Sequence, residues 1–379
     1  MSILSALKIS RRPAAAFVIV GLFWGCFAAL VPVLKAQIGA SDGLFGVLLL
    51  GTGIGLTTSI WLAPRIERLL GAPALMVASL VFAATFVLPS IATGPLMFGL
   101  FLVLLGATSG LTDVVMNARV STLEVASGRS LMNANHGMFS ASYAVAALLT
   151  GFAREAGWTP EAVFSVAALV AVALALTTKQ ELPAEEAEQN VGKSSLLWPV
   201  LLCGGVTLIA FMSEATVESW SALHIERTLL GGAAQGAMGP AALGLTMAIG
   251  RFSGQVIIEK TSEYSVILWA TLLSIIGVLI AATAPTPLIA YLGFGIMGLG
   301  ISVIGPMALA LVGRLVRRDV RTEAISKVAV IGFAGFFVAP VLMGFISEGF
   351  GLRIAFASVA LLLALVLPLI IMIRRLPMP

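Results

Sequence analysis

The sequence predicts an all-α membrane protein that crosses the bilayer about a dozen times. Its 379 residues are 59% hydrophobic and 11% charged, whereas a soluble domain is about 25% charged. The mean hydropathy is +1.06, and the apolar runs are about 20 residues long, enough for a helix to cross the hydrocarbon core. A transmembrane β-barrel would show segments of about 10 residues with alternating polarity. This sequence shows continuous apolar runs instead. The composition leaves no room for a soluble catalytic domain, so we expect neither an enzyme nor catalytic residues.

A membrane-length window divides the chain into twelve apolar runs. The predicted spans are 13–34, 43–63, 73–92, 95–117, 136–153, 161–178, 196–221, 238–258, 264–283, 287–312, 325–346 and 351–373. Basic residues at Lys8, Arg11 and Arg12 precede the first run. No convincing small-residue cleavage site follows that run, so we expect it to remain as the first span.

Positive charge is unevenly distributed between the segments that join these spans. If the N-terminus is cytoplasmic, the cytoplasmic segments hold most of the 22 lysine and arginine residues, and the opposite side holds only Lys35, Arg154, Arg227 and Arg353. This bias favours an orientation with both termini in the cytoplasm. Five tryptophans fall near predicted helix ends, as interfacial aromatic residues do. They are Trp61, Trp158, Trp198, Trp220 and Trp269.

The segment 179–195 is rich in Glu and has no apolar periodicity. It therefore reads as a cytoplasmic linker between two six-helix halves, 1–178 and 196–379. A shift of the second half by about 195 positions places Gly250 on Gly55, Gly305 on Gly110 and Arg314 on Arg119. One offset that serves several helices indicates a parallel internal duplication, so we expect two pseudo-symmetric six-helix bundles.

Motifs for nucleotide hydrolysis and metal binding are missing from the sequence. The string Gly192-Lys193-Ser194 resembles the end of a phosphate-binding loop, but the position that must be glycine is Ala187. The two histidines and two cysteines form no cluster, so neither a metal nor another cofactor is expected. Basic loops account for the net charge of +4, and no nucleic-acid partner is expected.

Few ionisable residues fall inside the predicted spans, and each is a functional hypothesis because a charge in hydrocarbon is costly. Asp113 and Glu214 are the candidates for proton coupling. Residue counting along the span that begins at 196 places Glu214 in its outer third, with Glu218 one turn further out. The alternatives are a hydrogen-bond anchor for Glu214 and a helix cap for Glu218.

Asp113 and Arg251 fall near the cytoplasmic ends of spans 95–117 and 238–258. Their similar depths allow an ion pair that would act as a cytoplasmic gate. A permanent structural pair and two separately hydrated residues are the alternatives. Further gate candidates are Arg119, Asn135 and His136; the last two begin a span and could equally cap it.

Aromatic and polar side chains on several spans are candidates for a substrate cavity. Small polar solutes are held by aromatic faces together with hydrogen-bonding groups. Packing inside the bundle is the alternative for the aromatic residues. The candidates are Trp24, Asn117, Tyr143, Glu218 and Trp220.

Four strings in the predicted spans carry a family resemblance: Asp113-Val-Val-Met-Asn117-Ala, Asn133-Ala-Asn-His136-Gly-Met-Phe-Ser140, Glu214-Ala-Thr-Val-Glu218-Ser-Trp220-Ser-Ala-Leu223 and Gly250-Arg251-Phe-Ser-Gly254. With them the chain resembles the major facilitator superfamily, over essentially its whole length. It is closest to a bacterial inner-membrane branch of unassigned substrate that is distantly similar to the fucose permeases. The loop 64–68 departs from the usual Gly-x-x-x-Asp-Arg-x-Gly-Arg pattern, although it keeps basic residues and one acid.

The resemblance implies the major facilitator fold and a transport function. The expected protein is a monomeric secondary transporter that moves a small polar, sugar-like solute across the bacterial inner membrane by alternating access, coupled to protons. Its partners would be the solute, protons and the lipid bilayer. Efflux of amphipathic compounds or lipids is an alternative, and a non-transporting membrane receptor or scaffold is an alternative of a different class.

Overall fold

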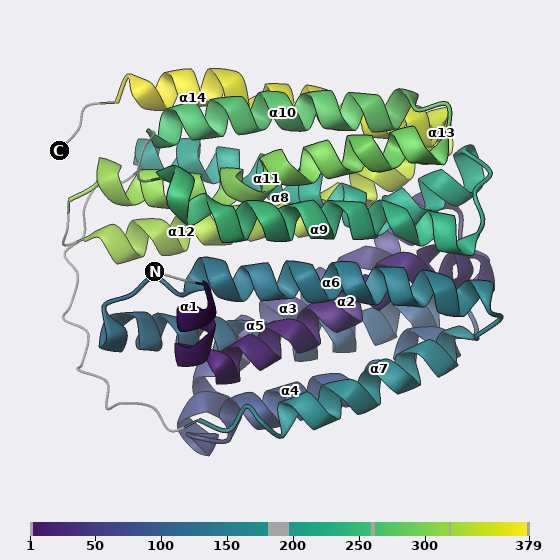
Figure 1. Cartoon of the computed structure of the whole chain (residues 1–379), viewed down its shortest axis with the longest axis horizontal. Helices are drawn as coiled ribbons and strands as arrows, with labels where there is room; N and C mark the ends of the chain where they lie inside the picture. The colour runs from purple at the N-terminus through teal and green to yellow at the C-terminus, as the bar shows by residue number, and fades with distance from the viewer. Residues whose placement is uncertain (1–2, 181–196, 259–261, 318–319, 377–379) are drawn as a thin grey trace.

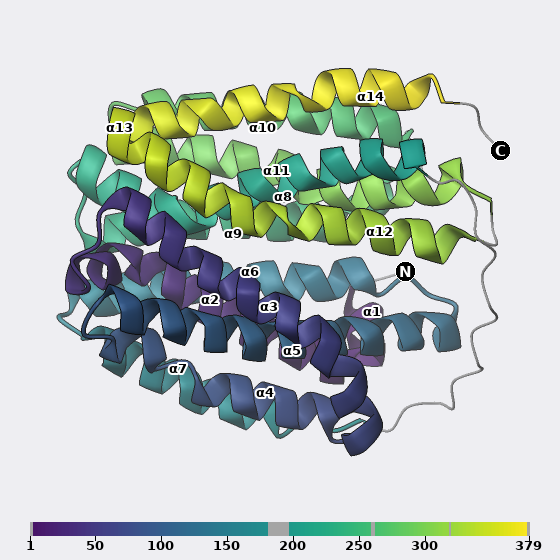
Figure 2. The ribbon, with the colours of Figure 1, turned by 180° about the vertical axis from the view of Figure 1, so that it is seen from behind.

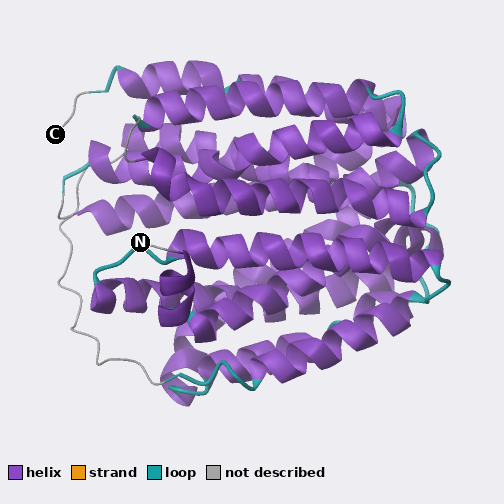
Figure 3. Cartoon of the chain, viewed as in Figure 1, coloured by secondary structure: helices purple, strands orange, loops and turns teal. Residues whose placement is uncertain are grey.

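The structure is a computed structural model that describes residues 3–180, 197–258, 262–317 and 320–376. These residues are almost entirely helical, and no strand occurs among them (Figure 3). Most of the predicted linker and the string 192–194 lie outside the described residues. The helices are α1 Ile3–Ile9, α2 Arg11–Gln37, α3 Asp42–Leu70, α4 Ala74–Ala84, η1 Leu88–Ile91, α5 Pro95–Ser127, α6 Met132–Glu155, α7 Pro160–Ala175, α8 Leu197–Leu223, η2 His224–Thr228, α9 Ala233–Ile258, α10 Glu263–Thr283, α11 Pro287–Leu315, α12 Arg321–Phe333, α13 Gly335–Ala364 and α14 Val366–Arg374.

Eight stretches of the described chain are helical, long and apolar enough to cross a membrane. The last of them runs from Glu323 to Arg374 and covers 52 residues, more than one crossing needs. Within it, Gly351 has φ 81° and ψ 163°, so the backbone leaves helical geometry at that residue. This break lies at the start of the predicted span 351–373.

The helices form two groups that lie one above the other in Figure 1. Helices α1–α7 make the N-terminal group and α8–α14 make the C-terminal group, and the view from behind shows the same division (Figure 2). Both chain termini lie at one end of the molecule. We call this the terminal end, and we call the opposite end, where α2 is followed by α3, the distal end.

The two groups touch chiefly along α6 with α9 and along α3 with α13. Glycine makes each contact close. A Cβ on Gly137 of α6 would lie 2.4 Å from the Phe252 ring of α9. A Cβ on Gly46 of α3 would lie 2.4 Å from the Pro340 carbonyl oxygen of α13. Gly137 thus leaves room for the Phe252 ring, and Gly46 lets the backbones of α3 and α13 approach directly.

Several helices extend well beyond the predicted spans, among them α3, which continues to Leu70 instead of ending at residue 63. Helix α5 continues to Ser127 instead of ending at residue 117, and α8 continues through the π-helical η2 to Thr228 instead of ending at 221. Polar residues end the apolar run, but they do not end a helix whose backbone hydrogen bonds continue. Asp113 and Glu214 therefore lie near the middle of their helices and not near an end.

Candidate functional site

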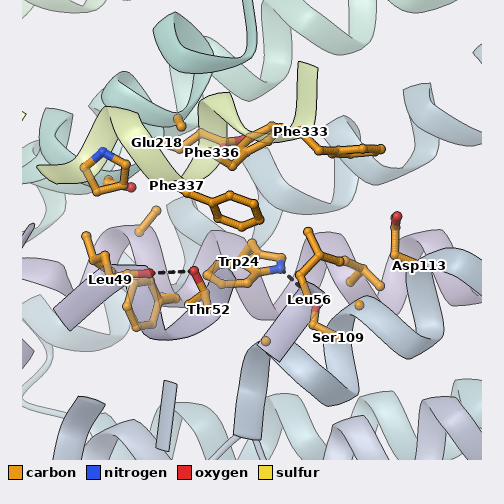
Figure 4. A pocket seen from close by; sticks show the side chains of 18 of the residues that line it. Trp24, Leu49, Thr52, Leu56, Ser109, Asp113, Glu218, Phe333, Phe336 and Phe337 are labelled. Carbon is orange, nitrogen blue, oxygen red and sulfur yellow. Dashed lines mark hydrogen bonds between the residues drawn. The ribbon is translucent and has the colours of Figure 1, made fainter. Parts of the chain in front are cut away.

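A cavity of about 200 Å³ lies where the two groups face each other. Helices α2, α3, α5 and α6 line it from one side, and α8, α12 and α13 line it from the other (Figure 4). Its walls are mainly aromatic and aliphatic, with two carboxylates and several hydroxyl groups. The lining residues are Val20, Trp24, Phe27, Ala28, Leu49, Thr52, Leu56, Gly106, Ser109, Gly110, Asp113, Phe139, Tyr143, Ala215, Glu218, Ser219, Phe333, Phe336, Phe337 and Pro340.

Trp24 of α2 presents its indole ring to the cavity (Figure 4). The indole Nε1 donates a hydrogen bond of 3.3 Å to Ser109 Oγ of α5. Phe23 and Phe27 meet the ring edge-on, with centroids 5.1 Å and 5.6 Å away. These contacts fix the orientation of the ring. A role for Trp24 in substrate binding stays a prediction.

Asp113 also lines the cavity, whereas Asn117 is not among the lining residues. The Asn117 Nδ2 donates to the Asp113 backbone oxygen at 2.8 Å and to Asp113 Oδ1 at 3.2 Å. Asn117 therefore orients the carboxylate from one helical turn away.

Glu218 and Tyr143 lie in the cavity wall without hydrogen-bond partners. Among the described residues, the Glu218 carboxylate makes neither a hydrogen bond nor an ion pair. The Tyr143 side chain is 1% exposed, and its hydroxyl has no partner in the described part of the chain. Buried hydroxyl groups are normally hydrogen-bonded, so a lone one in a cavity wall is a position where a ligand can bind.

Arg251 of α9 forms an ion pair with Glu214 of α8, with Arg251 Nη2 and Glu214 Oε1 3.0 Å apart. Both side chains are largely buried, with exposed fractions of 11% and 6%. The Arg251 Nη1 also donates to Ser140 Oγ of α6. The guanidinium group thus connects an acid of the C-terminal group to a hydroxyl of the N-terminal group.

The expected ion pair between Asp113 and Arg251 is absent from this structure, in which the arginine binds Glu214. A gate that forms this pair when the terminal end is shut stays a prediction. The expectation rested on depths counted from predicted helix ends, and those ends were wrong for α5 and α8. Glu214 lies near the middle of the segment Leu197–Thr228, at the level that Arg251 can reach. The depth of a residue along the helix axis also does not say in which direction its side chain points from that axis.

Trp220 does not line the cavity, and it does not lie at an exposed interface. Its side chain is fully buried and meets the Phe45 ring edge-on at 5.8 Å. Its neighbour two positions before, Glu218, faces the cavity instead. The other four tryptophans predicted at the interface are exposed: Trp61, Trp158, Trp198 and Trp269.

The remaining gate candidates make their hydrogen bonds and ion pairs inside the N-terminal group and the residues that follow it. Arg119 is fully buried, its Nε lies 2.9 Å from Glu67 Oε1, and it donates to the backbone oxygens of Gly71 and Gln180. Asn135 donates to Ser10 Oγ at 2.9 Å, and the His136 ring meets the Phe17 ring edge-on. These contacts join helices of one group, and a gating role for Arg119, Asn135 and His136 stays a prediction.

Sequence reasoning missed a set of ion pairs at the distal end, two of which join the two groups. Arg154 of α6 makes a bidentate pair with Glu226 of η2, at 2.6 Å and 3.0 Å. Arg227 of η2 makes a bidentate pair with Asp42 of α3, at 2.8 Å and 2.6 Å. Lys35 Nζ lies 2.9 Å from Asp42 Oδ1. The sequence held a sign of these pairs. Only four basic residues are expected on that side of the membrane, and three of them, Lys35, Arg154 and Arg227, are the partners of these acids.

Among the described residues, no group of three or more His, Cys, Asp or Glu side chains is placed to hold a metal ion. What the site offers is an aromatic and aliphatic cavity with two acids, set between two groups of long apolar helices. This combination defines a multi-pass membrane protein with a central site of small-molecule size.

Comparison with known proteins identifies the family. Residues 205–379 match the model of the Major Facilitator Superfamily. The chain is 31% identical over 361 residues to an uncharacterized MFS-type transporter of Yersinia pestis, covering 94% of this chain and 93% of that protein. The chain therefore belongs to the major facilitator superfamily, a family of membrane transporters, and is a multi-pass protein of the bacterial membrane.

Two solved structures have the same fold at low sequence identity. One is a bacterial homologue of the human lysosomal transporter Spinster in an inward-facing, occupied conformation, with a TM-score of 0.78 at 14% identity over 98% of this chain and 97% of that one. The other is a D-xylose–proton symporter, with a TM-score of 0.75 at 13% identity over 100% of this chain and 98% of that one. These similarities concern the fold alone.

Proposed function

We propose that the protein is a monomeric secondary active transporter that moves a small solute through the central cavity by alternating access. In this proposal the halves 1–178 and 196–379 are six-helix bundles that rock against each other around the cavity, joined by the linker 179–195. Both termini lie in the cytoplasm of a bacterial inner membrane. The observation that carries the proposal is a cavity walled by both groups, with ion pairs between the groups at one end.

The ion pairs indicate which side of the cavity is shut. Within the described residues, both ion pairs that join the groups lie at the distal end: Arg154 with Glu226 and Arg227 with Asp42. The Glu348 carboxylate of α13 adds hydrogen bonds from Ser41 Oγ and the Gly43 backbone N–H. These contacts must break for the distal side to open, so they belong to one of two states of the carrier.

We further propose that transport is coupled to protons through Glu214, with Asp113 as the second candidate. A proton on Glu214 would cancel the charge that holds the Arg251 guanidinium group. Because the same guanidinium group binds Ser140 of the other group, protonation would act on a contact between the groups. The D-xylose–proton symporter has the same fold, which supports coupling of this kind.

The lining changes the expected substrate. Five polar or aromatic candidates favour a sugar-like solute, but two of them, Asn117 and Trp220, are absent from the cavity wall. Phenylalanine rings occupy much of that wall instead. We therefore propose a solute that combines a polar group with an apolar body, and efflux of an amphipathic compound is the second candidate on the same observation.

A cysteine in the cavity tests the carrier hypothesis before a substrate is known. Ser219→Cys, which lines the cavity, should react with a membrane-impermeant maleimide in both right-side-out and inverted vesicles, because the cavity opens to each side in turn. Ser221→Cys is the matched control, since Ser221 is fully buried two positions away. Reaction of Ser219→Cys from one side only, under all conditions, would support a static receptor or scaffold.

A further inference from the structure

We propose that the central cavity binds a small organic cation: a protonated amine carried on an apolar or aromatic body. The proposal rests on the proposed transport function and adds the charge of the solute to it. Its basis is the charge of the cavity wall, the aromatic rings around it and one buried hydroxyl group.

The wall of the cavity offers acids and no basic side chain. Asp113 and Glu218 contribute carboxylates, and none of the lining residues is lysine, arginine or histidine. The nearby guanidinium group of Arg251 is already bound to Glu214 and Ser140. Asp113 receives only the amide of Asn117, and Glu218 has no partner among the described residues. An anion in this cavity would meet repulsion, whereas a cation would supply the missing counter-charge.

The rings of the wall suit a cation with an apolar body. The cavity is lined by Trp24, Tyr143 and five phenylalanines, among them Phe333, Phe336 and Phe337. Figure 4 shows Asp113 and Glu218 on opposite sides of the Trp24 ring in that view. An ammonium group is attracted to the faces of such rings, most strongly to tryptophan, when it is desolvated. A neutral polyol would need more hydrogen-bonding groups than this wall supplies.

The Tyr143 hydroxyl is an independent sign of a ligand. It is buried in the wall of the cavity and lacks a hydrogen-bond partner in the described chain. Its oxygen can accept a hydrogen bond from an ammonium N–H, while a carboxylate accepts a second one. A protonated amine therefore supplies a counter-charge for the unpaired acid and an N–H donor for the unpaired hydroxyl. A quaternary ammonium ion supplies the charge but has no N–H to donate.

A series of probes with one body and three charges tests the proposal. The probes are 2-phenylethylammonium, 2-phenylethanol and phenylacetate, titrated calorimetrically into the protein in nanodiscs, with empty nanodiscs as the blank. We expect the ammonium ion to bind at least about 10-fold more tightly than the alcohol, from cation–π attraction and charge-assisted hydrogen bonds. We expect no binding of phenylacetate. Equal binding of the ammonium ion and the alcohol, preference for phenylacetate, or absence of ammonium binding would each overturn the proposal.

Acid-to-amide variants locate the charge. Asp113→Asn and Glu218→Gln should each weaken 2-phenylethylammonium about 10-fold and leave 2-phenylethanol unchanged, which also shows that the variant is folded. Glu161→Gln, an exposed acid in the first turn of α7, should change neither. Undiminished ammonium binding in both cavity variants contradicts the assignment. This test can fail while the transport proposal holds. If Ser219→Cys is labelled from both sides but the probes bind without charge selectivity, the protein is a carrier whose solute is not a cation.

Discussion

At the scale of single residues, the buried Arg251 connects the two groups in the apolar part of the molecule. It pairs with Glu214 on the neighbouring helix and donates to Ser140 across the boundary between the groups. A buried charge that loses its partner is destabilising by several kcal/mol, because its desolvation is no longer compensated. The pair therefore stabilises the structure only while both members are present and ionised.

A double-mutant cycle measures this pair directly. Arg251→Gln should lower the free energy of unfolding by about 3 kcal/mol, because it leaves Glu214 unpaired. Arg251→Gln combined with Glu214→Gln should recover at least about 1 kcal/mol of that loss. The matched cycle with Asp113→Asn should give a coupling energy near zero. Coupling of Arg251 to Asp113 and not to Glu214 would contradict the structure.

At the scale of elements, η2 continues α8 and carries two adjacent residues of opposite charge to the other group. Glu226 receives Arg154 and Arg227 binds Asp42. Asp42 also binds Lys35 and accepts a hydrogen bond from Ser347, so it is the residue on which most distal contacts converge. Removal of its charge should weaken the closure of the distal end more than removal of any one of its partners.

Asp42→Asn tests that closure. Spin labels on Trp158→Cys and Leu230→Cys, both exposed, report the distance across the distal end. The variant should shift the distance distribution toward longer values, because it removes two of the ionic contacts. Glu323→Gln is the control, since its pair with Lys327 lies within one helix. An unchanged distribution in Asp42→Asn would mean that the distal pairs do not hold this end shut.

The contact between α3 and α13 gives a second test at the same scale. Gly46→Ala places a Cβ about where the Pro340 carbonyl oxygen approaches to 2.4 Å, so the two helices must separate. We expect the free energy of unfolding to fall by about 1–3 kcal/mol, the cost of forced overpacking. Gly94→Ala has open space around its Cβ and should be nearly neutral. Equal effects of the two substitutions would contradict the close contact.

The sequence predicted more of the fold than of the site. Hydropathy located the long apolar helices, since burial in lipid demands continuous apolar runs. The cost of charge in hydrocarbon pointed to Asp113, Glu214, Glu218 and Arg251, and the structure places two of them in the cavity wall. The sequence could not predict which residues these four contact, because pairing depends on how each helix is rotated about its axis and on where the helix ends. The apolar runs end before α5 and α8 do, so the prediction placed Asp113 and Glu214 too close to the ends of their helices.

At the scale of the whole molecule, the central claim is that the two groups move against each other around the cavity. The described structure has ion pairs between the groups at the distal end alone, and the cavity lies between that end and the terminal end. A carrier must exchange this closure for one at the terminal end. Rocking of rigid groups makes the two ends change in opposite directions.

Distances across both ends of the same protein test this claim most directly. One spin-label pair, Trp158→Cys with Leu230→Cys, spans the distal end, and a second, Val125→Cys with Ser326→Cys, spans the terminal end between α5 and α12. Cys26 and Cys203 are replaced by alanine in both. We predict two populations at each end, and Asp42→Asn should lengthen the distal distance while it shortens the terminal one. One unchanged distance at each end, in wild type and in Asp42→Asn, would contradict alternating access and leave the cavity as the binding site of a static membrane protein.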